Sequence, residues 1–229
     1  MRRIIKNLFN RAGYQLLRRQ FLTDADYIRN KAQFNPDKKI VVFDVGANVG
    51  NYAAKIISFA PSAVLYCFEP FQDSFAQLSA RFADNASVTT AQLALSNQEG
   101  KRRFYINQHS SETNSLLKPA NELQDSFVDV ACSTIDAFAQ KLGLEYIDVL
   151  KIDVQGTELD VLMGAAAMLE TQRIRLIRVE VIFDQLYDGQ SFFGDTLHYL
   201  TARGYKFSGF IEPVYNNNHM LWADAIFVK

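Results

Sequence analysis

The segment Val41–Tyr52, which reads VVFDVGANVGNY, restricts the possible folds of this chain more than any other segment. Its first residues are apolar and suited to a buried strand, and the acidic residue Asp44 stands at the end of that run. Gly46 and Gly50 follow, with Asn48 midway between them. Glycine permits left-handed backbone conformations and close approach of other groups. The pattern therefore predicts a buried strand, a tight turn and the start of a helix near Gly50.

Strand-like and helix-like segments alternate through the rest of the chain. Such alternation implies right-handed crossovers and a parallel sheet with helices on both faces. The last two expected strands have no helix between them, so one of them should run antiparallel. The sequence thus predicts an α/β fold with a Rossmann-like, mostly parallel sheet. The expected strands are residues 40–45, 63–68, 88–95, 147–153, 174–181, 205–212 and 224–229, and the expected helices are residues 50–59, 72–83, 134–142, 157–170 and 195–204.

The middle of the chain, residues 96–133, departs from this alternation. KRRFYINQ and SFVDVACST have alternating faces typical of strands, and the polar segment HSSETNSLLKPANELQD separates them. We expect an antiparallel excursion with a long loop. Loops of this length seldom occur without a function, so this segment and the 210–222 loop are expected to set specificity.

Composition narrows the class of partner. The 229 residues are 48% hydrophobic with a formal net charge of -1, which suits one compact domain that binds small molecules and argues against nucleic acid. Cys67 and Cys132 lie far apart without metal-ligand spacing, as expected of buried thiols in a reducing compartment. No run reaches the roughly 18 apolar residues of a membrane span, and no secretory signal is recognisable. We expect a cytoplasmic protein.

The N-terminus is the one segment with a distinct composition. We divide the chain into a basic helical extension, residues 1–35, and a main domain, residues 36–229. Apolar residues of the extension fall on one helical stripe and basic residues on the rest. Such a helix could lie on an anionic membrane surface, or pack on the domain or against a second subunit. The apolar stripe consists of Ile4, Ile5, Leu8, Phe9, Ala12, Leu16 and Leu17.

The turn that follows Asp44 favours one ligand class over another. Ligands of open parallel sheets bind beyond the carboxyl ends of the strands. A dinucleotide site requires G-x-G-x-x-G, whereas this turn reads D-x-G-x-N-x-G, and an acidic residue would repel a pyrophosphate. A sulfonium ligand with an ammonium group suits the turn better. Glu69 ends the next strand, where a carboxylate can accept both hydrogen bonds of a ribose diol.

These segments together resemble the FkbM-type methyltransferases, which use S-adenosylmethionine. The resemblance extends from about residue 40 to residue 229 and implies the seven-stranded sheet of class I methyltransferases. It also implies that Asp44, Gly46, Asn48 and Gly50 surround the methionine part of the cofactor, that Glu69, followed by Pro70, binds the ribose, and that Ser96 lies near the adenine. The matching segments are VVFDVGANVGNYA, YCFEP, LALSNQEG, STIDAF, IDVLKIDVQGTELDVLMGA, VEV and DAIFVK.

The segment LKIDVQGTE supplies the first candidate for catalysis. Asp153 should lie at the mouth of the sheet, where it could take a proton from a substrate hydroxyl, bind the cofactor ammonium or bind a metal. Glu180 in IRVEVIF is the second candidate, and His109 and His219, in polar segments, are loop-borne alternatives. Members of the family commonly carry Glu where this chain has Gln155, which leaves metal binding open.

We therefore expect methyl transfer to a hydroxyl oxygen of a small molecule or sugar. Two alternatives stay open at this point. An NAD-dependent oxidoreductase would use a similar sheet, although the missing G-x-G-x-x-G argues against it. A non-catalytic binding module derived from the same fold, which docks to a membrane or partner, would be consistent with Gln155.

Overall fold

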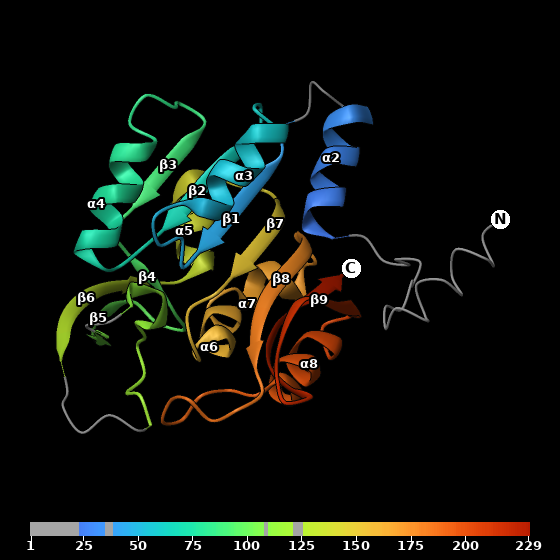
Figure 1. Ribbon diagram of the computed structural model, residues 1–229. Coiled ribbons are helices and arrows are strands. Elements are labelled where there is room, and N and C mark those ends of the chain that lie inside the picture. Colours follow the sequence, from blue (N-terminus) through green and yellow to red (C-terminus); the bar gives the residue numbers. More distant parts are fainter. Residues whose placement is uncertain (1–22, 35–38, 108–109, 121–125) are drawn as a thin grey trace, which may run out of the picture.

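The computed structural model describes residues 23–34, 39–107, 110–120 and 126–229 of the chain. Its centre is a seven-stranded sheet with the order β3-β2-β1-β7-β8-β10-β9 (Figure 1). Its strands are β1 Val41–Val45, β2 Val64–Phe68, β3 Val88–Ala91, β7 Ile147–Ile152, β8 Ile174–Ile182, β9 Lys206–Asn216 and β10 His219–Val228.

The pairing of these strands agrees with the expected fold class. The strands from β3 to β8 pair in parallel, and β10 is antiparallel to both β8 and β9. The expectation of a mostly parallel seven-stranded sheet with an antiparallel last strand is therefore confirmed. The strand order changes direction between β1 and β7, and such a point is where sheets of this type bind ligands.

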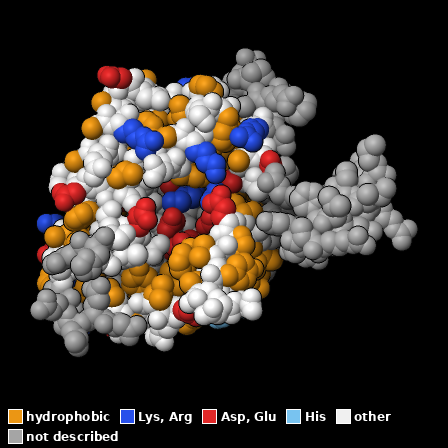
Figure 2. Space-filling view, in the orientation of Figure 1, with side chains coloured by type: hydrophobic (Ala, Val, Ile, Leu, Met, Phe, Trp, Pro, Cys, Tyr) orange, Lys and Arg blue, Asp and Glu red, His pale blue; other side chains and the backbone are white. Residues whose placement is uncertain are grey.

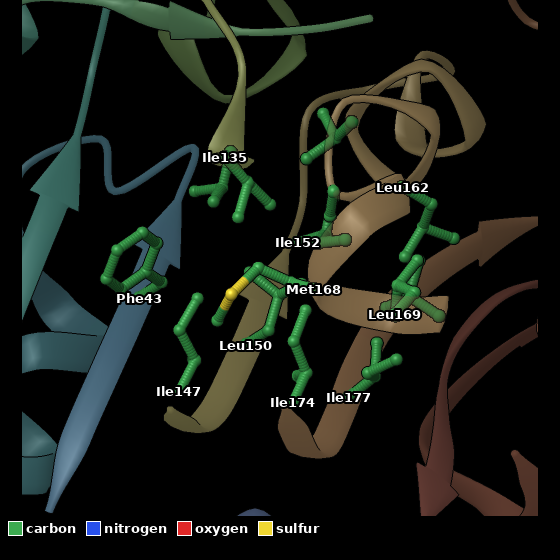
Figure 3. Close-up of a cluster of buried hydrophobic side chains, with 14 of the residues drawn as sticks. Phe43, Ile135, Ile147, Leu150, Ile152, Leu162, Met168, Leu169, Ile174 and Ile177 are labelled. Atoms are coloured by element: carbon green, nitrogen blue, oxygen red, sulfur yellow. The ribbon is translucent and has the colours of Figure 1, made fainter. Parts of the chain in front are cut away.

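Helices cover both faces of the sheet, and each face has its own hydrophobic core. One core lies under α2, α3 and α4 and includes the fully buried Ile28, Ile56 and Leu78. The other lies under α5 to α8 and joins residues such as Phe43, Leu150 and Ile177 of the sheet to helical side chains (Figure 3). The helices are α2 Asp24–Phe34, α3 Asn51–Phe59, α4 Gln72–Arg81, α5 Ile135–Leu142, α6 Glu158–Met163, α7 Ala166–Glu170 and α8 Phe193–Thr201.

The middle of the chain forms a second, three-stranded sheet. Strand β5 (Gly100–Tyr105) is antiparallel to β6 (Phe127–Ser133), as expected, and β4 (Ala94–Leu95) is parallel to β6. The expectation of one strand over residues 88–95 was wrong. The chain leaves the large sheet after Ala91 and enters the small one at Ala94, because β4 pairs with a segment that follows much later in the sequence.

The expected single helix over residues 157–170 is also divided in the structure. It forms α6 and α7, with Gly164 at the break. A Cβ atom at Gly164 would overlap the carbonyl oxygen of Ser96, so the backbone approaches another segment closely here. This tertiary contact favours a break that helical periodicity alone does not indicate.

The 210–222 segment was expected to be a loop, with its run of three Asn residues equally well explained as a hairpin turn; in the structure it is the end of a long β-hairpin. Strands β9 and β10 continue to Asn216 and from His219. Asn217 and Asn218 connect them with φ angles of 46° and 67°, which suits the two-residue turns of hairpins. The polar residues therefore specify a tight turn between strands.

At the N-terminus, α2 packs against β8 and buries Ile28 completely. The amphipathic stripe from Ile4 to Leu17 lies outside the described residues. Among the helices that the structure describes, none is long and apolar enough to cross a membrane.

Candidate active site

A row of charged side chains crosses three neighbouring strands near their carboxyl ends. Asp44 of β1 is paired in register with Lys151 of β7, and Lys151 with Arg178 of β8. Side chains two residues apart on a strand share a face, so these charges continue the face that carries the buried Val149 and Leu176 under α2 and α3. The apolar core on this face thus ends in buried ionic groups just before the site.

The turn after β1 is shaped by its glycines. Gly46 and Gly50 have φ angles of 75° and 82°, and Asn48 has a φ of 47°. A Cβ atom at Gly46 would overlap the carbonyl oxygen of Asp153, and one at Gly50 would lie 2.6 Å from the ring of Phe82. The turn is consequently held against the end of β7, and the first backbone amides of α3 face the space beyond the strands.

Glu69, just beyond β2, is fixed from both sides. Its Oε2 accepts a hydrogen bond from the Asn48 amide and its Oε1 accepts one from the Phe71 amide, each at 2.9 Å. Burial raises the pKa of Glu69 to about 7, although these amides and Lys151 act in the opposite direction. Both oxygens retain acceptor capacity, as a ribose diol requires.

These groups line a cavity of about 470 Å³ beyond the carboxyl ends of β1, β2, β7 and β8. Figure 2 shows acidic side chains gathered at the centre of this face, with basic side chains above them and apolar side chains below. The small sheet and the segment before β6 contribute a second wall. The lining residues include Gly46, Asn48, Tyr52, Glu69, Pro70, Leu93, Leu95, Phe104, Asn114, Leu116, Lys151, Asp153, Gln155, Thr157, Arg178, Glu180, Ile182, Leu186 and Trp222.

Lys151 organises the floor of the cavity. Its Nζ donates to the Gly46 carbonyl at 2.9 Å and lies 3.2 Å from Oδ1 of Asp44 and 3.4 Å from Oδ2 of Asp153. Burial alone would lower the pKa of Lys151, but Asp153 and Asp44 raise it above its ordinary value. The ammonium group therefore stays charged and joins the glycine turn to the end of β7.

Asp153 and Glu180 have opposite electrostatic environments. Burial opposes the ionisation of Asp153, but Lys151 and Gln155 outweigh it and lower the pKa of Asp153. Burial, together with the charges of Asp153 and Glu158, raises the pKa of Glu180. We conclude that near neutral pH Asp153 is ionised while Glu180 retains a proton.

Gln155 bridges these two carboxyl groups. Its Nε2 lies 3.0 Å from Oδ1 of Asp153 and 2.6 Å from Oε2 of Glu180, and its Oε1 accepts a hydrogen bond from the hydroxyl of Tyr187 at 3.1 Å. Gln155 has a φ of 60°, and its carbonyl accepts a hydrogen bond from Ser115 at 2.6 Å. An uncharged amide therefore lies between the two carboxyl groups.

We expect divalent cations to stabilise the folded Gln155→Glu variant. The new carboxylate would repel that of Asp153, and Mg²⁺ or Ca²⁺ would relieve the repulsion and displace the proton of Glu180. In thermal scans at pH 8, millimolar Mg²⁺ should raise the Tm of the variant by several degrees and leave the wild type unchanged. Gln92→Glu, the same change at an exposed position, is the control. A variant indifferent to both cations would contradict this account of Gln155.

The structure brings most of the expected site residues together. Gly46, Asn48, Glu69, Pro70, Asp153 and Glu180 line the cavity. Asp44 is completely buried behind this lining, in contact with Lys151. Ser96 is also completely buried, and its hydroxyl accepts a hydrogen bond from Arg102 at 2.6 Å. Leu93 and Leu95 line the cavity where the sequence favoured Ser96.

Of the two candidate histidines, His219 is described by the structure, and it does not join this group. His219 is exposed at the start of β10, with its Nε2 2.6 Å from Oδ1 of Asp184, and it is not among the cavity-lining residues. His109 lies outside the described residues. In the described ranges, no group of three or more His, Cys, Asp or Glu side chains is arranged to hold a metal ion.

Sequence reasoning did not identify Tyr52, Asn114 and Thr157, which also line the cavity. Nδ2 of Asn114 and Oγ1 of Thr157 are buried without a hydrogen-bond partner among the described residues. Asn114 lies in a polar loop whose sequence has no regular pattern. Arg178 could have been found, because it is two residues before Glu180 on the same strand face.

Comparison with solved structures identifies the fold. An rRNA methylase from Streptococcus thermophilus matches 90% of this chain and 93% of its own, with a TM-score of 0.50 at 12% sequence identity. Together with the strand order, this match shows the α/β fold of the class I methyltransferases. Residues 44–207 match the Methyltransferase FkbM domain. The chain belongs to the FkbM family of S-adenosylmethionine-dependent methyltransferases.

Two curated relatives carry more specific names. The 2-O-methyltransferase NoeI of Sinorhizobium fredii is 28% identical over 163 residues, which cover 66% of this chain and 66% of NoeI. The 31-O-demethyl-FK506 methyltransferase FkbM of Streptomyces tacrolimicus is 26% identical over 235 residues, covering 90% of this chain and 87% of that protein.

Proposed function

We propose that this methyltransferase acts on a hydroxyl oxygen of a small molecule or a carbohydrate. The observation that carries the proposal is the carboxylate of Asp153, which lines the cavity and has a pKa below its ordinary value. An ionised carboxylate can accept a hydrogen bond from a hydroxyl group and orient one of its lone pairs. The names of both relatives, which specify O-methylation, give independent support.

The site residues fit S-adenosylmethionine in their chemistry. Glu69 offers acceptors for the ribose hydroxyls, and the glycine turn offers backbone amides and close approach. Leu93 and Leu95 provide apolar contact for the adenine. Asp44 is too deeply buried to touch the cofactor directly, so we assign it to holding Lys151 and, through it, the Gly46 carbonyl.

The bound cofactor supplies an electrophilic methyl group on a sulfonium sulfur. The protein has to align the acceptor oxygen with the carbon–sulfur bond and exclude water. With the cofactor bound, Asp153 would accept the proton that the acceptor hydroxyl loses when its oxygen takes the methyl group and the sulfur leaves as a thioether. An oxygen that carries both the new methyl group and its proton is strongly acidic. A carboxylate with a low pKa is therefore basic enough to remove that proton. Glu180, kept protonated, can donate a hydrogen bond to another oxygen of the acceptor.

We expect Glu69→Ala to weaken the binding of S-adenosylhomocysteine about 100-fold, because hydrogen bonds to a charged group contribute roughly 1.5–3 kcal/mol each.

The affinity of the wild type for S-adenosylhomocysteine should also rise up to about tenfold between pH 6 and pH 8, because Glu69, with a pKa of about 7, becomes an ionised acceptor. Calorimetric titration measures both effects, with NAD as the negative control. Glu69→Gln should lose the pH dependence; a variant that keeps it would show that another group titrates.

Transfer itself can be tested with methyl-labelled S-adenosylmethionine and matched acceptors. The panel contains sugars and polycyclic alcohols, each with an O-methylated and an amino analogue. Label on the free hydroxyl compounds alone supports O-methylation. Label only on the amino compounds would contradict it. Tight cofactor binding with no transfer to any compound would favour the non-catalytic module instead.

A further inference from the structure

Asp24, the first residue of α2, is buried in a polar cluster close to the cofactor cavity. It is 1% exposed, and its Oδ2 accepts a hydrogen bond from the Tyr52 hydroxyl at 2.7 Å and one from Nη1 of Arg178 at 3.1 Å. The matched FkbM domain begins at residue 44, so α2 lies outside it. Figure 1 shows α2 beside α3 and β8, which carry the two donors.

Both donors line the cavity. Tyr52 belongs to the first turn of α3, directly after the glycine turn. Its ring centre lies 6.0 Å from Nζ of Lys151 and 5.5 Å from Cζ of Arg178, distances at which a cation is attracted to an aromatic face. Lys151 in turn contacts the Gly46 carbonyl and Asp153. A continuous set of contacts therefore joins α2 to the cofactor turn and to the candidate base.

The charge of Arg178 makes this arrangement dependent on Asp24. Arg178 is 7% exposed and pairs with Asp24, Asp224 and Glu212. Glu212 is largely exposed and also pairs with Lys55, so the buried Asp24 and the partly buried Asp224 compensate most of the charge. Without Asp24, the Tyr52 hydroxyl would lose its buried acceptor and the guanidinium group would lose its most deeply buried anion, both of which are costly.

We propose that α2 contributes to cofactor binding through Asp24. Asp24 is a positioning residue, which holds Tyr52 and Arg178 at the cavity wall. On this proposal the methyltransferase unit includes residue 24, and does not begin at residue 36 as composition suggests. The inference goes beyond O-methylation. It rests on the cofactor alone, so the identity of the acceptor does not affect it.

The test compares variants of the full chain by calorimetric titration with S-adenosylhomocysteine at 20 °C and by thermal scanning. We expect Asp24→Asn and Tyr52→Phe each to raise the Kd about tenfold. The double variant should bind more tightly than the product of the two single effects predicts, because both changes affect the contact between Asp24 and the Tyr52 hydroxyl. Once an acceptor is known, the KM for S-adenosylmethionine should rise more than kcat falls.

Two matched variants separate positioning from general stability. Asp148→Asn alters another buried carboxylate, which accepts a hydrogen bond from the Val41 amide, pairs with Arg175 and interacts with Tyr27 of α2, all at the opposite end of the strands, so it controls for a loosened α2 whose Asp24 contacts are intact. Tyr205→Phe removes another buried tyrosine hydrogen bond, to the carbonyl of Ile174. Both controls should lower the Tm and leave the Kd unchanged.

The proposal is overturned if Asp24→Asn and Tyr52→Phe lower the Tm as the controls do while the Kd stays within twofold of the wild type, or if their effects on the Kd simply add. If Asp24→Asn does not fold, the isosteric Tyr52→Phe, compared with Tyr205→Phe, decides alone. Wild-type binding without O-methylation would refute the proposed function and leave this inference intact.

Discussion

We expect Asp153→Asn to lower kcat by about 10²- to 10⁴-fold, the usual contribution of a positioned general base, while the Kd for S-adenosylhomocysteine changes little. Asparagine has the same shape, so the contact with Gln155 and the cavity wall should persist. It cannot accept the hydroxyl proton. Steady-state kinetics with an identified acceptor, combined with calorimetric titration, separates the two effects.

Asp160→Asn is the matched control for this substitution. Asp160 is a partly buried carboxylate that pairs with Arg102 at 3.1 Å and does not line the cavity. Its replacement should leave both kcat and Kd close to the wild-type values. If Asp153→Asn retains kcat within twofold, Asp153 is not the base.

The second large effect concerns the glycine turn. We expect Gly46→Ala to abolish measurable cofactor binding and to lower the Tm by several degrees. The left-handed conformation costs an alanine roughly 1–2 kcal/mol, and the new Cβ would also overlap the Asp153 carbonyl, which belongs to backbone that cannot rotate away. Relief of that overlap must move the turn or the end of β7, both of which line the cavity.

Gly143→Ala isolates the effect of contact from that of conformation. Gly143 ends α5 with a φ of 64°, but a Cβ atom there would have no neighbour within 4 Å. This variant should show a modest decrease in Tm, about 2–4 °C for each kcal/mol in a chain of this size, and unchanged cofactor affinity. Equal effects of the two substitutions would mean that backbone strain, and not the close approach of β7, makes glycine necessary at residue 46.

Local patterns in the sequence were enough to predict the sheet and to name several residues that line the cavity. Apolar strands that end at Asp44, Glu69, Asp153 and Glu180 must bring these residues to one edge, because parallel strands present their carboxyl ends together. Glu69 and the turn with Gly46 could be assigned for the same reason. These features depend on periodicity and on residues close in sequence, which a single sequence records directly.

Other features depend on contacts between distant segments. The break of residues 88–95 into β3 and β4 follows from pairing with β6, and the break at Gly164 follows from the approach of Ser96. Polar residues such as Asn114 and His219 gave no pattern by which to decide whether they face the cavity. Whether such a residue faces the cavity depends on the path of its loop, and that path is fixed only when the whole domain packs.

The sequence by itself thus determined the fold class, since strand and turn signals are local, and its motifs determined the family through their resemblance to known members. Only the tertiary structure decided which buried charged side chains contact one another. It placed Asp44 behind Lys151, set Gln155 between two carboxyl groups and brought Asp24 to Arg178 across 154 positions of the chain. Buried charges select their partners through packing in three dimensions, because the cost of leaving one unpaired is imposed only after water has been excluded.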